Sequence, residues 1–184
     1  MIISFILIAA FIISTVLFLI FALDLLIRGH EVSTSKKAKK ALVKIIRQYK
    51  PDANFFYDLG CAYGGLSLFI KRTLPILNVC AIDNSMVRIF FVKLRSKILK
   101  LKIDFKKQDI FAVDLCQADI VYAYLWYNLM PPLEKKLQNE LKNGSVVITN
   151  TSNFPTWQPV YKIVINPEAS VVPCPEMLFV YIKK

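Results

Sequence analysis

The chain has 184 residues, of which 55% are hydrophobic, and its 24 basic and 13 acidic side chains give a formal net charge of +11. It has one histidine, His30, and its four cysteines are scattered without the Cys-x-x-Cys spacing of metal sites. This composition argues against a bound metal and against histidine-based nucleophilic catalysis. No basic stripe interleaved with aromatic residues indicates a nucleic-acid partner, so we expect neither metal nor nucleic acid.

Residues 1–23 form an apolar run without a charged side chain, and Asp24 is the first charged residue. As a helix this run is roughly 34 Å long, enough to cross the hydrocarbon core of a bilayer. A cleaved signal peptide is the alternative, but no Lys or Arg precedes Arg28 and no small-residue cleavage motif ends the run. A buried core helix rarely runs so far without a charge. The sequence therefore predicts a transmembrane anchor over residues 1–23.

Basic residues follow the apolar run over residues 24–50, which predicts a juxtamembrane segment that faces anionic lipid head groups. A solvated face that acts only as a topology signal is the alternative for these side chains. Cytoplasmic flanks of membrane spans carry the excess of Lys and Arg, so we expect residues 24–184 on the cytoplasmic side. The bacterial inner membrane is preferred over the mitochondrial inner membrane, because no Arg-rich and Ser-rich transit peptide precedes the anchor. We interpret His30 as an interfacial polar residue.

The remaining chain alternates between helical and strand patterns. A first helix begins after Ser33, Thr34 or Ser35, any of which can cap it, and it ends before Pro51. Short apolar runs rich in β-branched and aromatic residues then predict strands. The predicted strands lie within residues 54–59, 78–83, 102–111, 118–126 and 145–151, and the predicted helices between them within residues 65–74, 85–100 and 131–144.

This alternation predicts an α/β fold with a doubly wound, mostly parallel sheet. Two further apolar runs, within residues 159–166 and 177–184, have no helical pattern between them, so they should pair as a C-terminal antiparallel hairpin. We expect the fold to be Rossmann-like, to occupy residues 51–184 as one domain, and to be preceded by the single transmembrane helix.

The stretch "YDLGCAYGG" at residues 57–65 follows the first predicted strand. Gly60 and Gly64 allow the backbone to turn tightly and to approach a ligand closely. In parallel sheets ligands bind at the carboxyl ends of strands, where Asp83 and Asp109 also follow their strands. An acid ahead of the glycines, at Asp58, suits a ligand with a cationic amino group better than a dinucleotide pyrophosphate.

The stretch resembles motif I of class I, seven-strand S-adenosylmethionine-dependent methyltransferases, which usually reads D/E-x-G-x-G-x-G. "AIDNS" at residues 81–85 is similar to their motif II, and "KQDIF" at residues 107–111 to the segment that contacts adenine. The resemblance covers about residues 33–164 and implies S-adenosylmethionine as cofactor. Ala62 departs from the pattern, since glycine is usual at that position.

A narrower resemblance involves the apolar anchor followed by "STSKKAKKAL", together with the segment from Tyr124 to Trp157. These features are similar to the membrane-anchored protein-lysine methyltransferases that modify the adenine nucleotide translocase and the ATP synthase c subunit, and to their small bacterial relatives. The resemblance implies a protein substrate with an accessible lysine in or near a membrane. A methyltransferase for a lipid or small amphiphile, and a degenerate, non-catalytic membrane interaction module, are the alternatives.

The resemblance also implies roles for individual residues. Asp58 would bind the amino group of the cofactor, Asp83 both ribose hydroxyls and Asp109 the adenine amine, although Asp109 has the alternative of a solvated loop acid. The complete expected cofactor site comprises Asp58, Gly60, Cys61, Ala62, Gly64, Asp83, Asn84, Asp109 and Ile110.

The expected acceptor site comprises Tyr124, Trp126, Tyr127 and Asn128, whose aromatic faces suit a cationic amine. The alternative for Tyr124 and Trp126 is a place in the core. Trp157 either shapes the same mouth or packs under the hairpin.

Overall fold

The computed structural model describes residues 2–28, 32–167 and 175–184. The chain forms two compact units, Met1–Val32 and Ser33–Lys184, each of which is described by itself. His30 and Cys174 lie outside the described residues. The interfacial position expected for His30 therefore stays a prediction.

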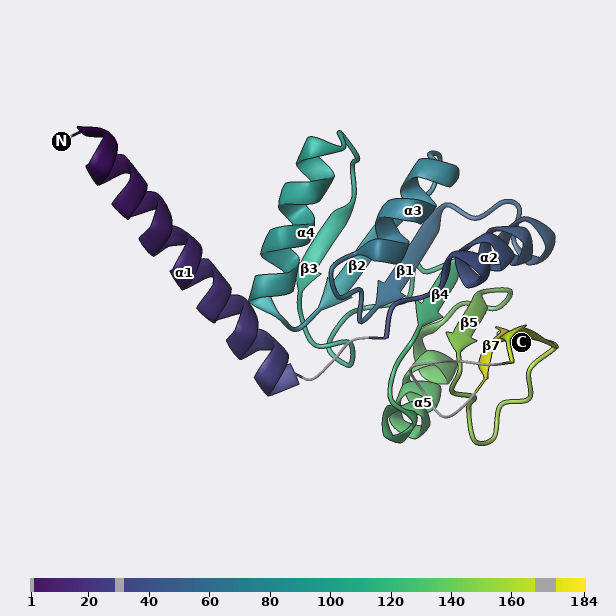
Figure 1. Ribbon diagram of the computed structural model, residues 1–184. Coiled ribbons are helices and arrows are strands. Elements are labelled where there is room, and N and C mark those ends of the chain that lie inside the picture. Colours follow the sequence, from purple (N-terminus) through teal and green to yellow (C-terminus); the bar gives the residue numbers. More distant parts are fainter. Residues whose placement is uncertain (1, 29–31, 168–174) are drawn as a thin grey trace. The chain divides into compact units, whose positions relative to one another are not determined.

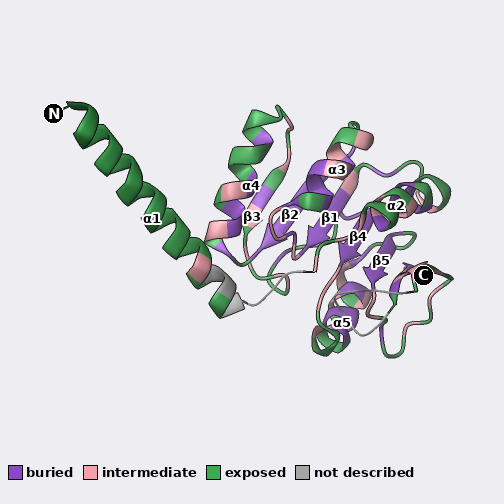
Figure 2. Cartoon of the chain, in the orientation of Figure 1, coloured by how far each residue is buried: buried purple, intermediate pink, exposed green. Residues whose placement is uncertain are grey.

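The first unit consists of the helix α1 (Ile2–Arg28). Its segment Ile2–Leu23 has a mean hydropathy of 3.0 and is long and apolar enough to cross a membrane. Its large side chains are exposed, including Phe5, Phe11 and Phe18, so α1 is not the core helix of a soluble domain. Figure 2 shows exposure along almost all of the described part of α1. Length and composition suit a membrane span, and signal sequences share both properties.

The second unit is built on a seven-stranded sheet with the order β3-β2-β1-β4-β5-β7-β6 (Figure 1). Strands β1 to β5 run parallel, β7 pairs antiparallel with β5, and β6 pairs antiparallel with β7. The predicted parallel sheet with a C-terminal antiparallel hairpin is thereby confirmed. The strands are β1 (Phe55–Leu59), β2 (Asn78–Asp83), β3 (Asp104–Lys107), β4 (Ile120–Ala123), β5 (Val146–Asn150), β6 (Tyr161–Asn166) and β7 (Glu176–Ile182).

The helices of this unit begin where their local signals place them. Ser35 accepts a hydrogen bond from the amide of Ala38 at 3.1 Å, and Ser85 accepts one from the amide of Arg88 at 3.2 Å, so both are side-chain N-caps. The helices are α2 (Lys36–Tyr49), α3 (Gly65–Thr73), α4 (Met86–Ile98) and α5 (Met130–Glu140), with a short 3-10 helix, η1 (Tyr127–Leu129), ahead of α5.

Both faces of the sheet are buried, which explains why its central strands read as continuous apolar runs. Phe56 of β1 points to the face covered by α2 and α3, whereas Tyr57 and Leu59 point to the face covered by α5. Val92 of α4 packs on the same face as α2 and α3, over the edge formed by β2 and β3. The carboxyl ends of β1 to β5 therefore meet at one edge, between two covered faces (Figure 1).

Candidate active site

The loop between β1 and α3 turns through a series of left-handed residues. Gly60 has φ +79°, Ala62 +53° and Gly64 +69°. The amides of Gly60 and Cys61 both donate to the carbonyl of Ile82, at 2.9 and 2.8 Å, and so tie the loop to the end of β2. A left-handed alanine costs roughly 1–2 kcal/mol. The turn is nevertheless formed with Ala62 at the position where glycine is usual.

Two glycines of this loop are needed for space as well as for conformation. A Cβ on Gly64 would lie 2.1 Å from Cγ2 of Val92 on α4. A Cβ on Gly60 would lie 2.8 Å from Cδ2 of Leu125, in the segment after β4. At these two positions the loop therefore meets its neighbours with backbone atoms.

Asp58 lies near the end of β1 with 2% of its surface exposed. Its Oδ2 accepts a hydrogen bond from the hydroxyl of Ser67 on α3. Burial raises the pKa of Asp58 to about 6, an effect that the Ser67 hydrogen bond opposes and the carboxylate of Asp83 reinforces. Asp58 is thus a buried acid that a cationic ligand group would stabilise in its charged form.

Asp83 ends β2 and is 5% exposed. Its Oδ2 accepts from the amide of Ala62 at 2.9 Å, and its Oδ1 accepts from the amide of Ser85 at 2.8 Å. The carboxylate therefore fixes the glycine loop as well as the start of α4, and each oxygen keeps a lone pair for a further donor. Asn84, which follows it, is exposed.

Lys39 of α2 lies beside the N-terminus of α3 and is a part of the candidate site that the sequence does not single out. Its Nζ lies 3.4 Å from the point where a Cβ of Gly65 would stand, at the N-terminus of α3. Partial burial lowers the pKa of Lys39, Asp58 raises it and Arg95 lowers it further. The sequence carries a signal for this position, because Lys39 shares helical spacing with the buried Leu42 and Ile46.

The end of β3 reaches the same edge. The amide of Gln108 donates to the carbonyl of Asp83 at 3.0 Å, which brings the following residues beside β2. Asp109 is exposed, and its Oδ1 accepts from the amide of Phe111 at 2.9 Å in a local turn. Ile110 packs against the core on the α5 face of the sheet.

The expected acceptor residues follow β4 at this edge. Trp126 and Tyr127 are 68% and 80% exposed, and Asn128 is also exposed, so the alternative of a core Trp126 is wrong. Tyr124 is partly buried against the core on the α2 face, and its hydroxyl accepts from Thr151 at 3.5 Å.

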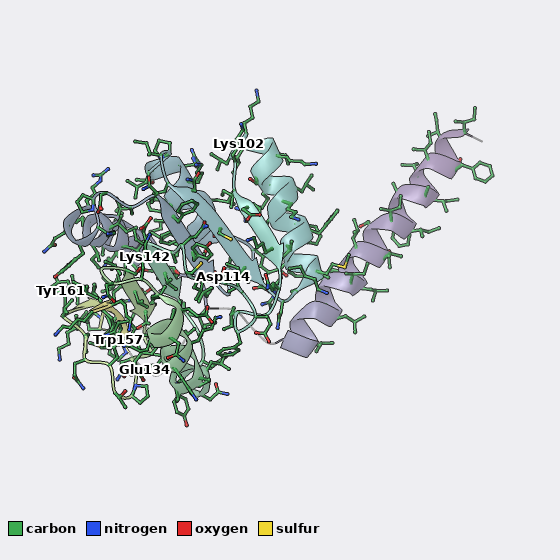
Figure 3. The ribbon with its side chains drawn as sticks, turned by 180° about the vertical axis from the view of Figure 1, so that it is seen from behind. Lys102, Asp114, Glu134, Lys142, Trp157 and Tyr161 are labelled. Atoms are coloured by element: carbon green, nitrogen blue, oxygen red, sulfur yellow. The ribbon has the colours of Figure 1, made fainter. Side chains whose placement is uncertain are left out.

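Trp157 is held on the other side of the sheet. Its ring lies 5.6 Å from that of Phe154 and 5.3 Å from that of Tyr181 on β7. Glu134 of α5 accepts hydrogen bonds from the backbone amides of Thr156 and Trp157 (Figure 3). Trp157 therefore packs against the α5-face core and the C-terminal hairpin, which is the second of the two expected alternatives.

A polar network that the sequence does not reveal joins β4, β5 and β7 to the segment ahead of α2. The hydroxyls of Thr34 and Tyr122 lie 2.7 Å apart, and Asn150 donates to both the Tyr122 hydroxyl and Glu176 at 3.1 Å. Glu176 also accepts from the amide of Ser35 at 3.2 Å. The network fixes the segment ahead of α2 to the ends of β4, β5 and β7.

These groups suit the parts of S-adenosylmethionine. The site offers the buried carboxylate of Asp58, the ammonium group of Lys39 that interacts with it electrostatically, a loop without side chains at Gly60 and Gly64, and a second carboxylate one strand away. An amino acid moiety, a ribose and a purine present complementary groups. Among the residues that the structure describes, no group of three or more His, Cys, Asp or Glu side chains is placed to hold a metal ion.

Comparison with solved structures shows the fold. The second unit resembles an RNA methyltransferase from Salinibacter ruber in complex with S-adenosyl-L-homocysteine, with a TM-score of 0.69 at 18% identity over 82% of this chain and 93% of that one. It also resembles the N-methyltransferase NodS from Bradyrhizobium japonicum, with a TM-score of 0.60 at 12% identity over 83% of this chain and 99% of that one.

Comparison of sequences shows the family. A protein-lysine N-methyltransferase from Saccharolobus islandicus is 23% identical over 130 residues, which cover 70% of this chain and 80% of the relative. The profile of the ANTKMT methyltransferase domain matches residues 58–161, from the buried acid of β1 to the start of β6. The match to this family confirms S-adenosylmethionine as the cofactor. The chain belongs to the ANTKMT methyltransferase domain family and is an S-adenosylmethionine-dependent methyltransferase.

Proposed function

We propose that the chain methylates a lysine side chain of a membrane protein. The observation that carries this proposal is the exposed aromatic pair Trp126 and Tyr127, next to Leu125, which lies against the glycine loop. The protein-lysine methyltransferase from Saccharolobus supports the acceptor class, and the apolar helix α1 supports a substrate in or near a membrane.

We place the second unit on the cytoplasmic side of a bacterial inner membrane. Lys and Arg residues are concentrated directly after the apolar segment of α1, and cytoplasmic flanks of membrane spans carry this excess.

The proposed cofactor site is assigned from the charged side chains at this edge of the sheet. Asp58 binds the amino group of the cofactor, and Lys39 binds its carboxylate together with the N-terminal amides of α3. The backbone of residues 60–64, with Cys61 and Ala62, lies along the methionine chain. Asp83 and Asn84 bind the ribose, and Asp109 and Ile110 bind the adenine.

The acceptor site positions an amine next to the proposed cofactor site. The cofactor supplies an electrophilic methyl group on a sulfonium, and the chain holds the lysine in line with it. Trp126 and Tyr127 contact the aliphatic stem and attract the cationic amine, which loses its proton to water at this exposed edge. Tyr124 and Asn128 orient the neutral amine through hydrogen bonds.

Replacing Lys39 by Met tests the carboxylate contact. We expect the dissociation constant for S-adenosylhomocysteine to rise about ten- to a hundredfold, because a hydrogen bond to a charged group contributes about 1.5–3 kcal/mol. Titration calorimetry on the purified full chain measures this change. Lys40→Met is the control, since Lys40 is an exposed neighbour on the same helix. Equal affinities for the two variants would contradict the role of Lys39.

The acceptor class is tested with membranes from cells that lack the chain. Purified full chain and cofactor with a labelled methyl group are added, and protein is separated from lipid before amino acid analysis. We expect label in methylated lysine, and none with an Asp83→Asn variant, which loses the ribose contact. Label confined to lipid would support the alternative acceptor. No label together with no binding of cofactor would support a non-catalytic module.

A further inference from the structure

Helix α4 exposes a row of large apolar side chains. Met86, Phe90, Leu94 and Ile98 are 73%, 61%, 47% and 71% exposed, and they follow one another at intervals of four residues. Residues at this spacing lie along one face of a helix. The opposite face of α4 packs into the core through Ile89 and Val92. We call these four exposed side chains the α4 stripe.

Basic side chains border the α4 stripe. Lys93 and Lys97 are exposed and stand three residues after Phe90 and Leu94, along one edge of the stripe. Lys100 and Lys102 follow the end of the helix, and Lys102 projects away from the fold (Figure 3). Residues 84–103 contain no acidic side chain. The face is therefore apolar along its length and positively charged at its border.

We propose that the α4 stripe docks on the surface of an anionic lipid bilayer. An amphipathic helix with lysines beside its apolar face lies in the interface, with the apolar side chains about 5–10 Å deep. Each lysine near an anionic surface adds about 1 kcal/mol. A second copy of the chain fits less well, because a symmetric contact between two stripes would bring their lysines together.

The position of the stripe links docking to the active site. Met86 begins α4 three residues after Asp83, so the stripe starts at the edge of the sheet that carries the candidate site. A bilayer on this face keeps that edge close to the membrane surface. The inference rests on the proposed membrane anchoring by α1, and it adds a second, peripheral contact made by the catalytic unit.

The test uses the full chain in lipid nanodiscs, with Cys116 and Cys174 changed to Ser. A nitrobenzoxadiazole fluorophore is attached at Leu94→Cys, and quenching by brominated phosphatidylglycerol is measured. Val164→Cys is the matched control, because Val164 is 51% exposed on β6, at the opposite edge of the sheet from β3. We expect quenching of about half of the signal at position 94 and little at position 164. Quenching at position 94 should fall in brominated phosphatidylcholine and in a Lys93→Gln/Lys97→Gln variant.

Three results would overturn the proposal. Quenching that is absent at position 94 while the chain stays in the disc shows that α1 anchors the chain but the stripe does not dock. Equal quenching at positions 94 and 164 shows that the catalytic unit meets the bilayer without a preferred face. A spectral shift at position 94 that grows with the number of chains per disc, without quenching by bromine, shows a second copy on the stripe. Binding of S-adenosylhomocysteine, measured separately, reports on the proposed cofactor site independently of these outcomes.

Discussion

An Asp58→Asn variant should bind S-adenosylmethionine about a hundredfold more weakly, because the contact that we propose between the buried charge and the amino group of the cofactor is lost. The same variant should be at least as stable as the parent chain without ligand at neutral pH. Asparagine keeps an oxygen that accepts the Ser67 hydroxyl, and it removes a carboxylate whose charged form is penalised by burial. Calorimetry and thermal unfolding, both on the full chain, measure the two effects.

The raised pKa of Asp58 makes the stability of the folded chain depend on pH. The pKa of Asp58 is raised from 3.8 to about 6, so the folded chain binds more protons than the unfolded chain between these values. The resulting stability is present below pH 4 and is lost as the pH rises through about 6, by on the order of 3 kcal/mol in total. Cofactor affinity should change in the opposite direction and increase up to about pH 6, since the amino group binds the carboxylate form.

Asp58→Asn should remove both of these pH dependences, whereas Ser67→Ala should keep them and shift them to higher pH, because the Ser67 hydrogen bond lowers the pKa of Asp58. A variant that retains full affinity would show that the amino group is held elsewhere. A variant that loses affinity together with stability would assign Asp58 a structural role instead.

A Gly64→Ala variant should lose about 2–5 kcal/mol of stability, as the sum of left-handed strain and overpacking. The new Cβ would stand 2.1 Å from Cγ2 of Val92, on a residue with φ +69°. Neither the loop nor α4 can move without breaking the contacts that Asp83 makes to both. The denaturation midpoint of the full chain measures the loss.

The neighbouring Gly65 provides the control for this variant. Gly65 is the first residue of α3, and the nearest atom to its Cβ would be the flexible end of Lys39 at 3.4 Å. Gly65→Ala should therefore stay within about 1 kcal/mol of the parent chain. In double-mutant cycles, Val92→Ala should couple favourably with Gly64→Ala, because it removes the methyl group that the new Cβ meets, and should show no coupling with Gly65→Ala. Equal stability of the two alanine variants would contradict the close packing of the loop on α4.

The fold was predictable because its signals are local. Ser35 and Ser85 precede amphipathic runs and cap helices, and the glycine stretch that begins at Gly60 turns where the first strand ends. The cofactor was predictable because an acid ahead of glycines and an acid after the next strand occur in a fixed order along the chain.

The rest of the site depends on contacts between distant segments. The network of Thr34, Tyr122, Asn150 and Glu176 joins the start of the catalytic unit to β4, β5 and the last strand, and no sequence period links such positions. Lys39 did leave a local signal, a cation within an apolar helical stripe. In the sequence alone, that signal is masked by the many other lysines that follow the apolar run. The roles of the four acceptor residues stay predictions, since the structure gives their exposure but not their partner.

The contact between Gly60 and Leu125 has a practical consequence for enzyme engineering. The side chain of Leu125 contacts the backbone of Gly60 in the glycine loop, and the next residue in the chain is the exposed Trp126 of the proposed acceptor site. Replacing Leu125 to admit a bulkier acceptor at that proposed site would also remove its contact with the glycine loop. In the site that we propose, acceptor selectivity and donor affinity would therefore change together when Leu125 is replaced.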